Sequence, residues 1–166
     1  MSGPKFTMAA MNDEERDALR RLLREVRVAH LGTLRDGAPM VSMTLFLPAA
    51  DLSQFHVHVS RLAWHTQDMG RDPRVALSIA QNDDARADPF TLARVTLRGS
   101  ASPLANDGPA FGTLKQSWLA RYPESAINFT LADFSFWAIR PHSARFIAGF
   151  GRIHNLSAQA LAGVAA

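Results

Sequence analysis

The feature of this chain that most constrains its fold is a tight turn between two apolar segments. Residues 27–34 and 39–47 flank the tripeptide Arg35-Asp36-Gly37. Asp-Gly readily adopts the positive φ angles of a two-residue hairpin turn, and the apolar runs on either side supply the paired strands. The sequence therefore predicts an antiparallel β-hairpin here, and a fold assembled from such hairpins.

Further strands are predicted along the rest of the chain. Apolar alternation predicts them over residues 54–60, 74–80, 91–101, 134–140 and 143–150. The last two are expected to form a hairpin that turns at Pro141-His142. About six or seven strands in hairpins, with two or three peripheral helices, predict a mainly β, α+β fold built on a small antiparallel barrel.

The peripheral helices carry their own local signals. Asn12 and Glu15 have the spacing of a capping box, and an apolar stripe with helical periodicity follows at Leu19, Leu22, Leu23 and Val26. A second helix is predicted over 107–121, ending at Tyr122-Pro123 because proline disfavours helix in the residue before it.

Length and composition indicate one soluble domain. The prediction is a flexible lead over 1–11, a single domain over 12–156 and a C-terminal tail over 157–166. No secretory signal and no membrane-length apolar run is recognisable, and there is no cysteine, so we expect a cytoplasmic protein without disulfides. Of its 18 basic residues 16 are Arg, and they are scattered along the chain. That scatter does not favour nucleic-acid binding, which usually concentrates charge.

One segment has the properties of an anion site. The run from Val57 to Ile79 starts as a strand, ends at Ser60-Arg61, enters a short helix broken near Gly70, and returns to a strand. Unpaired amides and the helix dipole at a helix N-terminus attract phosphate, and an arginine can bind its oxygens bidentately. We therefore predict that the phosphate of a bound cofactor lies here.

Other interpretations of the polar residues stay open. Arg61, His65 and Asp68 share one helix side, where they form either a surface ion-pair ladder or, together with Ser60 and Thr66, a phosphate site. The pair His56-x-His58 lacks a third ligand at motif spacing, so no metal site is predicted. No serine-nucleophile elbow or dinucleotide fingerprint is recognisable, and no catalytic residue is assigned.

The order of these segments resembles the pyridoxamine 5'-phosphate oxidase-like, FMN-binding split-barrel superfamily. The resemblance is carried by A-H-L-G-T-L-R-D-G-A-P-M-V-S-M (29–43), V-S-R-L-A-W-H-T-Q-D-M-G-R-D-P-R-V-A-L (59–77) and R-F-I-A-G-F-G-R-I-H-N-L (145–156). The last segment and the S-x-L-A-x-H-T pattern are most similar to the haem-utilisation (HugZ-type) branch.

The resemblance implies an antiparallel, Greek-key split β-barrel that forms a homodimer, with FMN at the subunit interface. By position, it implies contacts of the FMN phosphate with Ser60, Arg61, His65 and Thr66, and of the flavin with Ser42, Met43 and Thr44. Trp118 and Arg121 of the partner subunit would close the site. The function implied first is an FMN-dependent oxidoreductase acting on an unknown small molecule.

One departure from the family pattern keeps alternatives open. The chain has V-S-M-T-L-F where true pyridoxamine phosphate oxidases have R-x-V-L-L-K, so that substrate is not expected. The haem-utilisation branch instead implies a haem-binding or haem-degrading protein, with His154, interpreted as solvent-facing, as the candidate iron ligand. A flavin-binding module without turnover is the third interpretation.

Overall fold

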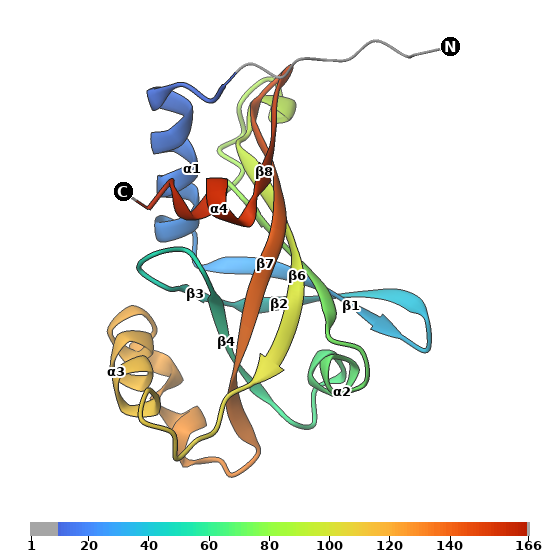
Figure 1. The fold of residues 1–166 in the computed structure, drawn as a ribbon, viewed down its shortest axis with the longest axis vertical. Coiled ribbons are helices and arrows are strands. Elements are labelled where there is room, and N and C mark those ends of the chain that lie inside the picture. The colour runs from blue at the N-terminus through green and yellow to red at the C-terminus, as the bar shows by residue number, and fades with distance from the viewer. Residues whose placement is uncertain (1–9, 166) are drawn as a thin grey trace.

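One curled antiparallel sheet makes up most of this protein (Figure 1). The computed structural model describes residues 10–165. Within them the strand order is β2-β1-β5-β6-β7-β4-β3, and β8 pairs with the second half of β7. The strands are β1 (Val28–Arg35), β2 (Ala38–Leu45), β3 (Leu47–Pro48), β4 (Phe55–Ser60), β5 (Arg74–Ala80), β6 (Arg94–Pro103), β7 (Phe134–Gly149) and β8 (Arg152–Ser157). The predicted mainly β, antiparallel barrel class is confirmed.

The helices lie around the two ends of the sheet. They are α1 (Asp13–Glu25), α2 (Trp64–Arg71), α3 (Phe111–Arg121) and α4 (Ala158–Ala162), with 3-10 segments η1 (Pro89–Thr91) and η2 (Pro123–Thr130). In Figure 1, α1 and α4 lie together at one end, whereas α2 and α3 lie on opposite sides of the other end. Within residues 10–165 no helix has both the length and the apolar character needed to span a membrane.

Two local predictions are confirmed. The Glu15 amide donates to Asn12 Oδ1 at 2.8 Å and the Asn12 amide donates to Glu15 Oε2 at 3.0 Å, which is a complete capping box. Between β1 and β2, Asp36 and Gly37 both have positive φ, 53° and 82°. This geometry matches the right-handed twist of the strands and fixes the hairpin register.

The main core fills the inside of the curled sheet. Leu19, Leu22 and Leu23 of α1 pack there against inward-facing residues of the strands, such as Leu31, Phe55 and Leu77. A second, smaller aromatic cluster lies under α3 and consists of Trp118, Tyr122 and Phe136. The sheet therefore has one filled inner face and an outer face that α3 and η2 cover only in part.

The predicted hairpin at Pro141-His142 is wrong, because β7 continues through both residues. The pairing with β6 shifts register there, from Arg98 opposite Ser143 to Gly99 opposite Pro141. A Cβ on Gly99 would lie 2.2 Å from the Arg140 carbonyl oxygen, so only glycine permits this approach. The bulge accommodates proline inside a strand, which local sequence signals do not reveal.

The real turn of that hairpin lies at Gly149–Gly151, where both glycines have positive φ. It joins β7 to β8, a strand that was not predicted. The tail is folded: Leu161 and Val164 are fully buried, and Arg20 Nε donates to the Val164 carbonyl at 3.0 Å. Residues 1–9 of the expected lead lie outside the described residues.

Other boundaries differ by a few residues. Helix α3 begins at Phe111 rather than at residue 107, because turns occupy the residues before it, including Gly108 and Pro109. It ends before Tyr122-Pro123 as predicted. Helix α2 runs through Gly70 and ends at Arg71.

Candidate functional site

The N-terminus of α2 and the loop before it form the first part of the candidate site. The N-cap residue Ala63 supplies no side-chain acceptor, and the first turn contains no acidic residue. Arg61, Leu62 and Trp64 are exposed around this turn, and Arg61 has no side-chain partner among the described residues. An uncapped helix start beside a free guanidinium favours an anion.

Ser60 has a structural role that the sequence did not indicate. Its hydroxyl hydrogen-bonds Asp133 Oδ2 and accepts from the Leu62 amide at 3.1 Å, while the Arg61 amide donates to the Asp133 carbonyl at 2.7 Å. Asp133 thereby fixes the loop that precedes α2. A phosphate bound at Ser60 would lie beside this carboxylate and be repelled by it. The anion-binding part of the loop is therefore Arg61 and the first amides of α2.

A buried carboxylate holds α2 to the hairpin. Asp68 Oδ2 accepts from Thr33 Oγ1 at 3.0 Å, and Oδ1 accepts from Arg35 Nε at 3.1 Å. The Arg35 guanidinium also lies 4.2 Å from the centre of the Trp64 ring. This network, and not the surface ladder considered above, uses Asp68, and it presents the exposed Trp64 indole on a fixed support.

The side chains of Thr66 and His65 lack the exposure and the charge expected of an open phosphate site. Thr66 is buried, and its hydroxyl has no hydrogen-bond partner within residues 10–165. Burial lowers the pKa of His65 below its ordinary value, although the negative charge of Asp68 opposes this shift. His65 is therefore a neutral imidazole at neutral pH, able to donate or accept a hydrogen bond rather than supply charge.

The three predicted flavin contacts on β2, Ser42, Met43 and Thr44, lie on two different faces of the strand. The Thr44 side chain is buried and its hydroxyl donates to the Leu45 carbonyl, whereas Met43 is 65% exposed on the opposite face. Ser42, Met43 and Thr44 cannot all face one ligand, because successive strand side chains alternate. Met43 instead lies beside His30 of β1, its direct cross-strand partner.

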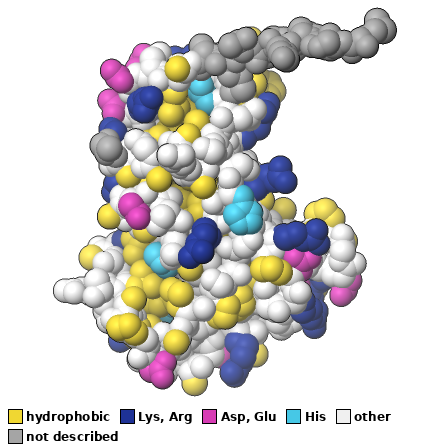
Figure 2. All heavy atoms as spheres, viewed as in Figure 1, with side chains coloured by type: hydrophobic (Ala, Val, Ile, Leu, Met, Phe, Trp, Pro, Cys, Tyr) yellow, Lys and Arg dark blue, Asp and Glu magenta, His cyan; other side chains and the backbone are white. Residues whose placement is uncertain are grey.

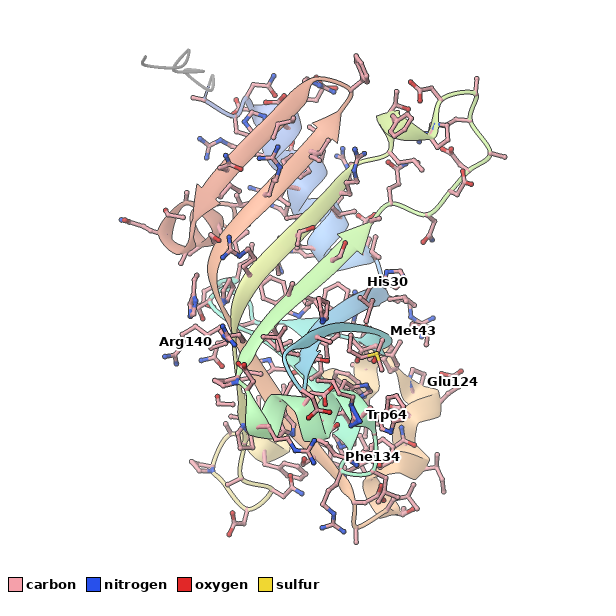
Figure 3. All side chains as sticks on the ribbon, turned by 90° about the vertical axis from the view of Figure 1, so that its right-hand side faces the viewer. His30, Met43, Trp64, Glu124, Phe134 and Arg140 are labelled. Carbon is pink, nitrogen blue, oxygen red and sulfur yellow. The ribbon has the colours of Figure 1, made fainter. Side chains whose placement is uncertain are left out.

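His30 and Met43 belong to an open apolar surface. Val28 and Val41 lie on the same face, with exposures of 40% and 65%. Figure 3 shows His30, Met43 and Trp64 along one side of the molecule. We call Val28, His30, Val41 and Met43 the open face. His30 is exposed, and no described residue bonds its imidazole.

Trp118 and Arg121 were predicted to close the ligand site from the partner subunit. In this structure both side chains form hydrogen bonds within their own subunit. Trp118 is 1% exposed, and its indole N–H donates to Ser125 Oγ at 2.9 Å. Arg121 donates to the carbonyls of Arg24 and Val26 and, at 2.9 Å, to the Tyr122 hydroxyl. These two side chains offer no free group to a ligand in this subunit structure.

His154 is buried, so the interpretation of it as solvent-facing is wrong. Its exposure is 7%, and its Nε2 lies 3.2 Å from Glu15 Oε2 of α1. Burial alone would raise the pKa of Glu15, but the Asn12 amide, His154 and Arg152 together lower it. The role of His154 as an iron ligand stays a prediction, and that role requires separation of the imidazole from Glu15.

Of the pair His56-x-His58, His58 lies under α3. His58 is 8% exposed and stacks on Phe129, with ring centres 4.1 Å apart. Burial, with a smaller contribution from the charge of Lys115, lowers the pKa of His58 to about 4. The described residues contain no group of three or more His, Asp or Glu side chains placed to hold a metal ion.

Sequence reasoning missed His30, Arg35 and Asp133. Arg35 and His30 stand within the quoted hairpin segment, but their importance depends on α2 and on the exposure of the sheet. Asp133 is 73 residues from Ser60. No local pattern relates such distant residues. The one signal in the sequence was the predicted hairpin, whose register places His30 opposite Met43.

A family model described as "CREG, beta-barrel" matches residues 12–161. The chloroplastic non-canonical heme oxygenase HOZ of Arabidopsis thaliana is 34% identical over 114 residues, which are 69% of this chain and 33% of that protein. The chain thus spans about a third of the plant relative's length.

Two further similarities concern bacterial proteins. Heme oxygenase HutZ of Vibrio cholerae is 22% identical over 141 residues, which are 84% of this chain and 79% of HutZ. The solved structure of a heme binding protein from Mycobacterium smegmatis is 26% identical, has a TM-score of 0.79, and the match covers 89% of this chain and 60% of that one.

Proposed function

This chain belongs to the CREG β-barrel family, and from that premise we propose that it is a haem-binding protein of the HutZ type. The predicted resemblance to the split-barrel superfamily and to its haem-utilisation branch is confirmed. The observation that carries the proposal is the 34% identity to a heme oxygenase over 69% of the chain. Haem therefore comes before FMN, the cofactor that the sequence analysis favoured.

The open face has the side chains that a haem requires. Its aliphatic members can contact the flat apolar macrocycle, while Arg61, exposed and without a side-chain partner among the described residues, is a cation suited to a propionate. Histidine nitrogen and methionine sulfur are both common iron ligands. Haem bound here would supply redox and oxygen chemistry, whereas the protein supplies the ligand, the charges and the dry surface.

We assign His30 as the iron ligand in preference to His154. The His30 imidazole is exposed on the open face and unbonded by any described residue. The His154 imidazole faces the buried Glu15 carboxylate, which would lose this partner and keep only the Asn12 amide and Arg152 if the imidazole moved to a haem. The cost of breaking that contact favours the free histidine.

A homodimer is part of the same proposal. Val41 and Met43 are each 65% exposed on β2, at the edge of the sheet. Exposed apolar side chains grouped on a sheet edge favour contact with another molecule. A second copy covering this face would enclose the haem and exclude water, in agreement with the subunit-interface position that the sequence resemblance implied.

The test is a titration of the purified chain with hemin, followed by the Soret band. For the wild type we expect saturation near one haem per chain. In His30→Ala we expect a shifted Soret position and about tenfold weaker binding. His142→Ala, which removes another exposed histidine away from the open face, is the matched control and should bind like the wild type. Loss of the Soret change in His154→Ala with a normal His30→Ala would contradict the ligand assignment. Absence of saturable hemin binding would contradict the function.

FMN remains a second candidate because of one observation, the uncapped start of α2 beside Arg61. A phosphate there would gain the helix amides and one guanidinium. FMN titration with Arg61→Ala tests it, and about tenfold weaker binding in the variant is expected if the phosphate lies there. Tight FMN binding without hemin binding would restore the flavin oxidoreductase hypothesis.

A further inference from the structure

We propose that a cavity on the outer side of β6 and β7 is a separate binding site for small molecules that carry a carboxylate or phosphate group. The cavity has a volume of about 330 Å³ and its polar lining consists of Gln54, Ser100, Ser102, Arg140 and His142. Nothing in the proposed haem site uses these residues. In Figure 3, Arg140 lies on the side of the molecule opposite His30, Met43 and Trp64.

The lining residues are brought together by the two long strands. Arg140 of β7 is the direct cross-strand partner of Ser100 of β6, and Ser102 follows two positions later on the same face. Gln54 approaches from the start of β4. Positions on paired strands are held more rigidly than positions on loops, so the site is preorganised.

The bulge in β7 supplies the histidine. The register shift pairs Arg98 with Ser143 and Gly99 with Pro141, which leaves His142 as the extra residue without a partner on β6. Bulges commonly redirect a side chain next to a functional site. Here the His142 Nε2 lies 3.2 Å from Ser100 Oγ, inside the cavity lining.

The charge of the cavity is positive and uncompensated. No Asp or Glu is part of the lining, and Arg140 has neither a hydrogen bond nor an ion pair with any residue in 10–165. In Figure 2, Lys, Arg and His side chains lie in the middle of this surface, over β6 and β7. A free guanidinium beside two hydroxyls, an amide and an imidazole matches the several acceptor oxygens of a carboxylate or phosphate.

The size and lining also exclude a large flat ligand. Ligand pockets start at about 300 Å³, so this cavity is at the small end of that range. Apart from the His142 imidazole, its lining contains no aromatic ring. A haem or flavin ring would find little apolar surface to cover it here, which separates this site from the open face.

The experiment is a proton NMR titration of the His142 imidazole with inorganic phosphate and, separately, with succinate. The pH is fixed and NaCl holds the ionic strength constant. We expect a saturable shift of the His142 resonance with at least one of the two anions. Binding should weaken about tenfold in Arg140→Ala and recover in part in Arg140→Lys, which keeps the charge but loses the fork.

Arg98→Ala is the matched control, because it removes a positive charge from the outer side of β6 without altering the cavity lining. It should bind both anions like the wild type. Equal weakening in Arg98→Ala and Arg140→Ala would overturn the proposal in favour of unspecific attraction, and so would a shift that does not saturate. Saturation by only one anion identifies the group that the site prefers and supports the proposal.

A hemin titration of Arg140→Ala separates this inference from the proposed function. We expect hemin to bind normally, since the cavity and the open face lie on different sides. Loss of hemin binding together with loss of anion binding would overturn the independence of the site and assign Arg140 to a haem propionate. Failure of hemin to bind the wild type leaves the anion titration fully interpretable.

Discussion

Two parts of the outer face of the sheet carry the same kinds of polar residue and use them in opposite ways. Where α3 and η2 cover the outer face, His58 is buried in an aromatic cluster, and Arg121 hydrogen-bonds carbonyls at the end of α1. Where no helix covers it, Arg140 and His142 line an open cavity. Coverage, not residue type, decides whether an arginine or histidine serves the fold or remains free for a ligand.

The contrast between the two arginines has a simple physical cause. A helix ends with carbonyl groups that lack intrahelical donors, and a cation close to them is favoured by the helix dipole. Arg121 meets this need for α1 from another helix, so its charge is already used. Arg140 faces hydroxyls and an imidazole, none of which neutralises it.

Removing Arg121 tests the covered part and should have the largest effect. Arg121→Ala leaves the carbonyls of Arg24 and Val26 without their donor, and the Tyr122 hydroxyl loses one of its bonds. We expect a loss of about 3 kcal/mol in the free energy of unfolding, measured by urea denaturation. Arg121→Lys should recover part of it. A loss below about 0.5 kcal/mol would contradict this structural role of Arg121.

His58 tests the same part through pH. Its pKa is lowered to about 4 in the folded protein, whereas the ordinary histidine value is 6.5. Below that ordinary value the unfolded chain binds a proton that the folded protein rejects, so stability falls as the pH drops from 6.5 towards 4. His58→Phe removes this proton and keeps a ring in the aromatic cluster.

We therefore expect His58→Phe to lose less stability than the wild type between these pH values, by on the order of 2 kcal/mol. Urea denaturation at several pH values measures the difference. His142→Phe, at an exposed position, should follow the wild-type profile. Parallel profiles for wild type and His58→Phe would show that His58 is solvated. The contrast between the covered and the uncovered part of the sheet would then lose its histidine example.

The smallest effect is predicted for the uncovered part. Arg140→Ala should change the free energy of unfolding by less than about 0.5 kcal/mol, because Arg140 has no partner among the described residues. The same urea denaturation measures it beside Arg121→Ala. A loss as large as that of Arg121→Ala would mean that Arg140 stabilises the fold, and the cavity would then have no free cation.

Much of the fold was predictable because its signals are local. The Asn12–Glu15 capping box spans three residues, and the Asp36-Gly37 turn needs only its own backbone angles. The end of α3 at Tyr122 follows from a single proline. The failure at Pro141 has the opposite origin, because a glycine on another strand makes room for the proline.

The candidate site was predictable only in part. The sequence located the start of a short helix just after Arg61, since strand periodicity ends there. It assigned Ser60 to a ligand, although Asp133 engages its hydroxyl. The family resemblance placed Met43 with Ser42 and Thr44 along one ligand, although strand alternation puts Met43 on the other face.

By itself, the sequence determined the antiparallel hairpins, the capped first helix and the resemblance to a split barrel, because each depends on residues close together in the chain. Only the tertiary structure decided which polar groups are free. Arg121 and Val26 are 95 residues apart, and so are the Tyr122 hydroxyl and the Arg27 carbonyl. A charged or polar group is available to a ligand only when no such distant partner reaches it, and folding alone decides that.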